Sequence, residues 1–171
     1  KTLNPKIHGG ILARRDKKSH LDDLETQNIN PIDLVVVNLY PFEQTISKEN
    51  VSWDEAIENI DIGGPTMIRA AAKNYQDVLV VTNPAQYSDL INAFSAKTIT
   101  SELRKQYSQQ AFEHTAIYDL TISRWIANKI TSKKASWLQG LPLKQELRYG
   151  ENPHQKASWY GESDKGWSAA N

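Results

Sequence analysis

The chain has 171 residues, with 20 basic and 20 acidic side chains and therefore no formal net charge at pH 7. Balanced charge gives no overall field that would attract nucleic acid or an anionic membrane, and no apolar run approaches the ~20 residues that cross a bilayer. The absence of cysteine excludes disulfides and thiolate zinc sites and fits a cytoplasmic protein. The length suits one domain, or one domain with part of another.

The first strand signal follows a polar N-terminal region. Residues 1–16 contain Pro5 and the pair Gly9-Gly10, so we expect a turn-rich segment. Residues 16–30 are mostly polar and charged, which favours a surface loop or a short helix. Residues 34–37 then form an apolar run of leucine and valines, the pattern of a strand that is buried on both faces of a parallel sheet.

Helices and a second strand come next. Ser52 and Glu55 form the sequence pattern of a capping box at the start of a helix. That helix places four apolar side chains on one side, namely Trp53, Ala56, Ile57 and Ile60. Residues 78–81 predict a second buried strand, followed by helices over residues 85–94 and 101–131, the latter capped by Thr100 or Ser101. Because strands alternate with helices, we expect a parallel α/β layer.

Residues 61–74 give the strongest indication of a ligand site in the chain. A carboxylate and two glycines precede a short alanine-rich helix, and we expect Pro65 at the first helical position. Gly63 and Gly64 would turn backbone amides toward an anion or a developing oxyanion. Lys73 would lie eight residues into the helix, about 12 Å along it, with its flexible stem leaning back toward such a ligand. The alternative is a plain turn with a solvated basic face.

Polar side chains directly follow the first predicted strand. Asn38 and Tyr40 come after residues 34–37, and ligands of open parallel sheets bind beyond the carboxyl ends of the strands. We therefore expect these residues and the turn at 61–64 to converge on one pocket. Tyr40 could instead be a packed turn aromatic, and Asp61 a solvated carboxylate at a helix end.

Other candidate chemistry is sparse. The histidines His8, His20 and His114 lack the spacing of metal ligands and no Ser/His/Asp arrangement is visible, so we expect no metal site and no nucleophilic triad. Lys1 and Thr2 suit phosphate or oxyanion partners, although a terminal lysine is more often solvated.

The composition changes near residues 132–142, where Gly140, Pro142 and paired lysines make a polar linker. The polar motif at 147–155 that follows has no helical or strand period of its own. We expect it to open a second domain that packs away from the first, with the two domains over residues 1–140 and 141–171.

Four groups of residues occur in order along the chain. They are Lys-Thr-Leu-Asn-Pro-Lys-Ile-His-Gly-Gly-Ile-Leu-Ala-Arg at 1–14, Asn-Leu-Tyr-Pro-Phe at 38–42, Asp-Ile-Gly-Gly at 61–64 with Arg-Ala-Ala-Ala-Lys-Asn at 69–74, and Leu-Arg-Tyr-Gly at 147–150 with Asn-Pro-His-Gln at 152–155. Together they resemble the bifunctional family that joins AICAR transformylase to IMP cyclohydrolase in purine biosynthesis. The family usually has histidine where Asn4 stands. The resemblance implies an α/β, methylglyoxal-synthase-like parallel sheet flanked by helices, followed by the start of a second α/β transformylase domain.

The resemblance also implies site residues. The catalytic positions of the cyclohydrolase match Lys1, Tyr40, Asp61 and Lys73. Positions that line its nucleotide site match Thr2, Asn38, Ile62, Gly63 and Gly64. Positions that hold the transformylase substrate match Arg148 and Tyr149, with His154 in the same motif. The family's N-terminal phosphate-binding segment and most of its transformylase domain would lie outside residues 1–171, so we expect a fragment that is inactive alone.

The implied reaction closes formyl-AICAR to IMP with loss of water and needs no cofactor. In the whole enzyme, 10-formyltetrahydrofolate would be the co-substrate that formylates AICAR. The expected protein is a cytoplasmic homodimer that binds these small nucleotides and neither nucleic acid nor membrane. Two other interpretations remain open: a non-catalytic effector-binding module of the same fold, and a structural remnant that cannot bind. The motif at 147–155 argues against the module, which would carry no transformylase opening.

Overall fold

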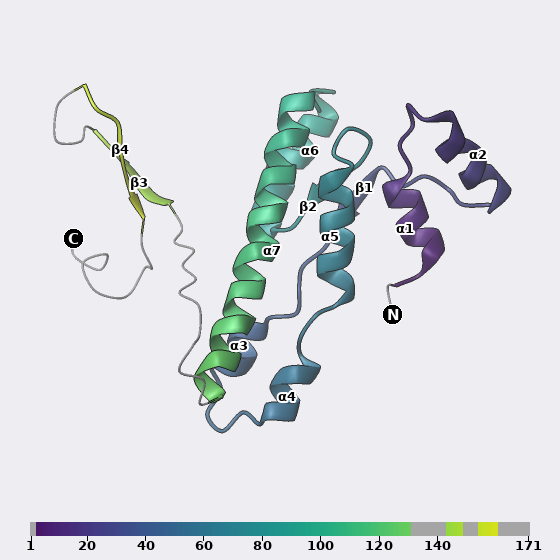
Figure 1. Cartoon of the computed structure of the whole chain (residues 1–171). Coiled ribbons are helices and arrows are strands. Elements are labelled where there is room, and N and C mark those ends of the chain that lie inside the picture. Colours follow the sequence, from purple (N-terminus) through teal and green to yellow (C-terminus); the bar gives the residue numbers. More distant parts are fainter. Residues whose placement is uncertain (1–2, 131–142, 149–153, 161–171) are drawn as a thin grey trace. The chain divides into compact units, whose positions relative to one another are not determined.

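The computed structural model describes residues 3–130, 143–148 and 154–160 (Figure 1). The chain divides into two compact units, Lys1–Thr131 and Ser132–Asn171. Within the described residues, the first unit holds the helices and a parallel pair of strands, and the second holds an antiparallel pair. No helix in these ranges has both the length and the apolar character needed to span a membrane.

In the first unit, the two strands are separated by groups of helices. In chain order the elements are α1 (Pro5–Leu12), α2 (Lys18–Thr26), β1 (Leu34–Val36), α3 (Phe42–Ile46), α4 (Trp53–Glu58), α5 (Gly63–Lys73), β2 (Leu79–Val81), the 3₁₀ turn η1 (Pro84–Gln86), α6 (Tyr87–Ser95) and α7 (Ser101–Lys129). β1 and β2 are parallel, with Leu34 opposite Leu79 and Val36 opposite Val81. Parallel strands need a long crossover, and α3, α4 and α5 supply it. The predicted α/β class is confirmed.

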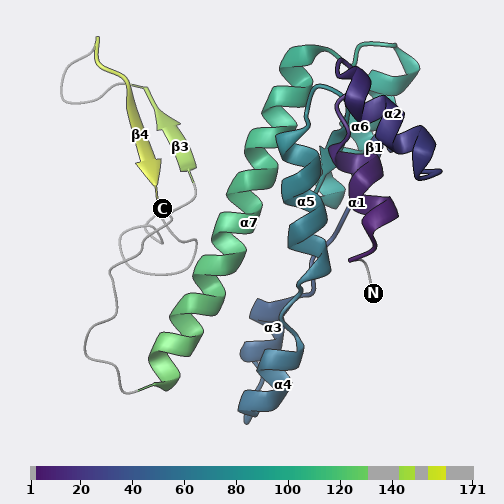
Figure 2. The ribbon, with the colours of Figure 1, turned by 45° about the vertical axis from the view of Figure 1, so that its right-hand side comes forward.

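Helices cover the strand pair and form three apolar clusters. Figure 2 shows α5 between α1 and α7, in agreement with the contacts of these helices. Val35, Val78 and Val80 pack with α5 and α7 in one cluster. Leu79 and Val81 face the opposite way and pack with α6 and the first turns of α7. The third cluster joins α3, α4 and the end of α7 through Phe42, Ala56 and Trp125.

The N-terminal region is more ordered than the sequence pattern predicts, because residues 5–12 form helix α1. The Asn4 side chain accepts a hydrogen bond from the Lys6 N–H at 2.9 Å and caps the helix, and Pro5 occupies its first position. The glycine pair serves close packing rather than a turn. A Cβ on Gly10 would lie 2.5 Å from the Asn30 carbonyl oxygen.

The predicted strands and helices differ from the observed ones in detail. β2 is buried throughout, as predicted, whereas Val36 of β1 is 47% exposed, so the expectation that β1 is buried on both faces is wrong. The Ser52 hydroxyl caps α4 by accepting from the Glu55 N–H, and the Thr100 hydroxyl caps α7. Pro65 is the third residue of α5 and not the first. It is tolerated there because the first-turn amides of a helix have no intrahelical partner.

The second unit contains β3 (Leu143–Leu147) and β4 (Ala157–Tyr160), which pair antiparallel. Of the described residues in the motif at 147–155, for which we expected no strand period, only Leu147 belongs to a strand. A hairpin can form without an alternating apolar pattern when its two strands satisfy each other's backbone hydrogen bonds. These strands pair with each other and not with β1 or β2, so they do not extend the first sheet. The two domain ranges stay a prediction.

Candidate functional site

The carboxylate of Asp61 connects the segment after β1 to the start of α5. Its Oδ1 accepts a hydrogen bond from the Gly64 N–H at 2.8 Å, and its Oδ2 accepts one from the Tyr40 N–H at 3.3 Å. The structure therefore brings Tyr40, Asp61 and Gly64 together at the carboxyl end of the strand pair, as the sequence predicts. We call this place the Asp61 rim, formed by Tyr40 and residues 61–64.

Glycine at position 64 is required by the geometry of the Asp61 rim. A Cβ on Gly64 would lie 2.5 Å from Asp61 Oδ2 and 2.7 Å from Leu39 Cδ2. The N-cap residue Ile62 makes no side-chain cap, so the carboxylate of Asp61 takes over that role. A negative group is favourable at this end of a helix because the helix dipole is positive there.

This cap changes the expectation about oxyanion binding. The Gly64 N–H points to the Asp61 carboxylate, so it does not present an open amide to a ligand. Gly63 is the first residue of α5, and its amide lies at the positive end of the helix. Among the two glycines, Gly63 is therefore the better candidate for an anion contact.

The side chains around the Asp61 rim are accessible. Tyr40 is 56% exposed and Ile62 is 62% exposed, so a ligand can reach both. Asn38 donates a hydrogen bond through Nδ2 to the Tyr87 hydroxyl at 3.3 Å. Because Tyr87 begins α6, this bond joins the residues that follow β1 to those that follow β2.

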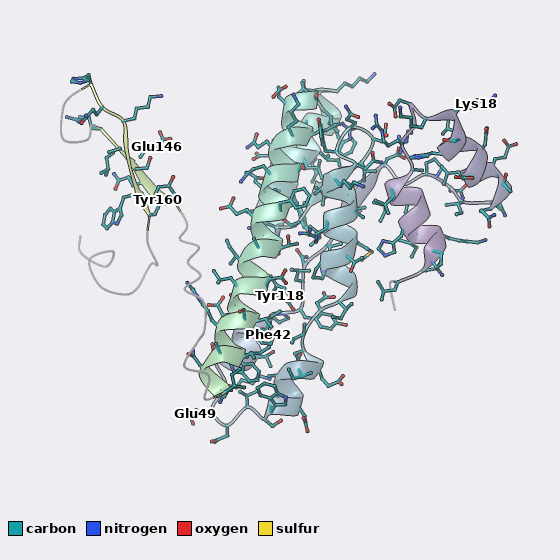
Figure 3. All side chains as sticks on the ribbon, viewed as in Figure 1. Lys18, Phe42, Glu49, Tyr118, Glu146 and Tyr160 are labelled. Atoms are coloured by element: carbon teal, nitrogen blue, oxygen red, sulfur yellow. The ribbon has the colours of Figure 1, made fainter. Side chains whose placement is uncertain are left out.

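Tyr118 of α7 is a neighbour of the Asp61 rim that the sequence pattern did not reveal. The Asp61 N–H donates a hydrogen bond to the Tyr118 hydroxyl at 2.8 Å. The Tyr118 ring also packs edge-to-face with Phe42, with 6.3 Å between ring centroids (Figure 3). Nothing in the sequence marks Tyr118, since a tyrosine in a long helix is usually a packing residue.

Lys73 lies away from the Asp61 rim. It is the last residue of α5, ten residues after Gly63, which places it about 15 Å along the axis. Its side chain is exposed and makes no hydrogen bond or ion pair within the described part of the chain. The helix begins two residues earlier than predicted, so the separation exceeds the expected 12 Å. The catalytic role of Lys73 stays a prediction.

The remaining predicted site residues lie elsewhere or cannot be placed. Lys1, Thr2 and Tyr149 fall outside the described residues. Arg148 directly follows β3 and is exposed, and His154 is exposed in a turn before β4. Residues 3–130, 143–148 and 154–160 contain no cluster of three or more acidic or histidine side chains that could hold a metal.

His114 of α7 lies in a partly buried environment. Burial lowers the pKa of its imidazole. Its Nε2 atom is buried and has no hydrogen-bond partner within the part of the chain that the structure describes. The side chain lines a cavity of about 250 Å³ beside Thr82 and Asn83, which follow β2. This environment favours a neutral imidazole.

Two family models match the chain. A model described as "MGS-like domain" matches residues 1–66. A model described as "AICARFT/IMPCHase bienzyme" matches residues 71–171, more than half of the chain. The chain belongs to the AICARFT/IMPCHase bienzyme family. The resemblance predicted from the four sequence motifs is confirmed, and so is the methylglyoxal-synthase-like fold class.

Relatives in the bienzyme family are longer than this chain. A protein of Prochlorococcus marinus (strain NATL2A) is 84% identical over 171 residues, which are all of this chain and 33% of the relative. One from Synechococcus sp. (strain CC9605) is 58% identical, over 99% of this chain and 33% of its own length. Both are named bifunctional purine biosynthesis protein PurH. The chain thus spans about a third of the curated relatives it matches.

A solved structure has the same fold over most of the chain. The crystal structure of ForH superimposes with a TM-score of 0.63 and 30% sequence identity, covering 72% of this chain and 64% of that one. This likeness supports the placement of helices around the strand pair.

Proposed function

We propose that the first unit carries the cyclohydrolase site of a bifunctional purine-biosynthesis enzyme, and that the Asp61 rim is where the ring closes. The observation that supports this most is the position of the Asp61 carboxylate. It lies at the carboxyl end of a parallel strand pair and at a helix N-terminus, between the amides of Tyr40 and Gly64. We infer the reaction itself from membership of the bienzyme family.

The proposed reaction converts formyl-AICAR to IMP and water. The carboxamide nitrogen attacks the formyl carbon, a carbon–nitrogen bond forms, and the carbonyl electron pair moves to the formyl oxygen. The carboxamide nitrogen then gives up one of its protons and the formamide nitrogen gives up its own, both protons go to the former formyl oxygen, and that oxygen leaves as water while a carbon–nitrogen double bond forms, so atoms and charge balance. Both reacting groups belong to one molecule, and orientation by the protein supplies much of the acceleration without a cofactor.

Besides orienting the substrate, the protein must transfer protons and stabilise the oxyanion, and the residues of the Asp61 rim suit both tasks. The Asp61 carboxylate would accept a proton from the attacking nitrogen, and the exposed Tyr40 hydroxyl would donate one toward the oxygen. The Gly63 amide would stabilise the developing oxyanion. Asn38 and Ile62 would contact the nucleotide. Roles for Lys1, Thr2 and Lys73 rest on the family resemblance alone.

The second unit would contribute to formyl transfer. Arg148, Tyr149 and His154 would help to hold the AICAR substrate, and 10-formyltetrahydrofolate would donate the formyl group in the whole enzyme. We also propose a cytoplasmic homodimer and expect the 171-residue chain to be inactive alone. These proposals rest on the family and on relatives that are about three times as long.

A full-length chimera tests the proposal. This chain would replace the matching third of the Prochlorococcus marinus (strain NATL2A) relative, which is 84% identical to it. Formyl-AICAR would be supplied directly, and IMP would be followed by absorbance and chromatography. We expect the full-length chimera to form IMP at a rate close to that of the parent enzyme.

The alternative functions give different results in the same assay. An effector-binding module would bind formyl-AICAR or IMP without converting one to the other. A structural remnant would neither bind nor convert them. A chimera that transfers the formyl group normally but forms no IMP would therefore overturn the proposed function.

A further inference from the structure

Tyr118 contacts both chain segments that form the Asp61 rim. Its hydroxyl accepts the hydrogen bond of the Asp61 N–H at 2.8 Å. Its ring packs against Phe42, two residues after Tyr40. Figure 3 shows Tyr118 and Phe42 close together beside α7. A single side chain of α7 thus links the start of α3, which follows β1, to Asp61, which lies two residues before α5 begins.

The ring and the hydroxyl of Tyr118 have separable tasks. Phe42 also packs edge-to-face with Trp125, at 5.9 Å between centroids, and Trp125 stacks on Trp53. Packing around Phe42 is therefore shared among several rings. The bond to the Asp61 N–H, in contrast, is made by the Tyr118 hydroxyl. Replacing that hydroxyl by hydrogen removes the bond while the ring contact stays.

The protonation state of the Tyr118 hydroxyl is compatible with its hydrogen bond to the Asp61 N–H. Burial raises the pKa of the Tyr118 hydroxyl above its ordinary value, so it stays protonated near neutrality. A neutral phenol oxygen can accept a hydrogen bond from a backbone N–H. Because the bond is partly buried, little water is at hand to replace it.

We propose that Tyr118 is a positioning residue for ring closure, which fixes the Asp61 backbone through its hydroxyl and so sets where the Asp61 carboxylate meets the substrate. This inference rests on the proposed function of the Asp61 rim. It predicts that the hydroxyl affects the chemical step more than substrate binding, since misplacing a catalytic group by about 1 Å can cost up to 100-fold in rate.

The test compares Tyr118→Phe with Tyr107→Phe in the full-length chimera. Tyr107 is a matched control because it lies on the same helix and burial also raises its pKa, but it packs with Leu79, Val81 and Leu90. We expect Tyr118→Phe to lower kcat for ring closure about 10-fold to 100-fold, with KM changed less than about twofold. Formyl transfer should be unchanged, and Tyr107→Phe should leave both reactions unchanged.

Hydrogen exchange gives a second measurement that does not depend on activity. In the 171-residue chain, Tyr118→Phe should accelerate exchange of the Asp61 amide at least tenfold, and Tyr107→Phe should not. An unchanged Asp61 amide would overturn the inference.

Asp61→Ala separates this inference from the proposed function. If Asp61→Ala slows ring closure and Tyr118→Phe does not, Tyr118 has no positioning role and the proposed function stands. If neither variant slows ring closure, the proposed function is itself wrong.

Discussion

Asp61 and Gly64 form a closed cap in which Asp61 Oδ1 accepts the Gly64 N–H at 2.8 Å and no room is left for a side chain at position 64. The same carboxylate accepts the Tyr40 N–H through its other oxygen. The hydrogen bonds from the Gly64 and Tyr40 N–H groups therefore determine where the carboxylate lies at the end of the strand pair. The proposed chemistry depends on this position.

Gly64→Ala should disrupt the Asp61 rim. The new methyl group would lie 2.5 Å from Asp61 Oδ2 and 2.7 Å from Leu39 Cδ2, so the carboxylate must move. We expect ring closure in the full-length chimera to slow about 10-fold to 100-fold. The free energy of unfolding of the 171-residue chain, measured with urea, should fall by about 1–3 kcal/mol.

Gly9→Ala is the matched control for this substitution. A Cβ on Gly9 would meet only the Ile29 side chain, 3.1 Å from its Cδ1 atom, and alanine is the better helix former. We expect a change in unfolding free energy within about 1 kcal/mol. Equal losses of stability and activity for the two variants would show that the crowding around Gly64 has no special effect.

Asn4→Ala should weaken helix α1. The Asn4 side chain accepts the Lys6 N–H at 2.9 Å, and loss of an N-cap typically costs about 0.5–2 kcal/mol. Asn4→Ser should retain most of this stability because serine is also a good N-cap. Urea unfolding of the 171-residue chain measures both. If Asn4→Ala and Asn4→Ser are equally stable, the cap does not contribute.

The residues that determine α1 show what the sequence could predict. An asparagine before a proline is an N-cap signal, so α1 was predictable, but the Gly9-Gly10 pair favoured a turn. The function of these glycines depends on the contact between Gly10 and Asn30, twenty residues away. Close packing between distant segments leaves no periodic pattern in the sequence.

The candidate site was also predictable only in part: the local pattern placed some residues, whereas contacts between distant segments could not be predicted. The strand-end rule placed Tyr40 beside the turn that contains Asp61, and the Asp61 hydrogen bonds agree with it. Tyr118 could not be predicted, because its contact with Asp61 spans 57 residues and depends on how α7 packs. The distance of Lys73 from the rim depended on where α5 begins, and helix starts are uncertain by a few residues.

The partly buried His114 should make the stability of the first unit depend on pH. Its folded-state pKa lies below the unfolded value of about 6.5, so the unfolded chain takes up a proton first as the pH falls. The stability is fully present above pH 6.5 and is lost as the pH falls toward the folded pKa. Urea unfolding at pH 7.5 and 5.5 should show a smaller loss in His114→Gln than in the unmodified chain.

His154→Gln is the control for this pH effect. This substitution also removes one histidine, but at an exposed position in the second unit. If the loss of stability between pH 7.5 and 5.5 is the same with and without His114, another group is responsible.

The dependence of ring closure on the Asp61 rim is tested by comparing Asp61→Ala and Arg148→Ala in the full-length chimera. Ring closure is measured with supplied formyl-AICAR, and formyl transfer is measured separately. We predict that Asp61→Ala slows ring closure by about 10²–10⁴ and spares formyl transfer. Arg148→Ala should slow formyl transfer about 10-fold to 100-fold and spare ring closure. If Asp61→Ala closes the ring at the unmodified rate, the Asp61 rim is not the site.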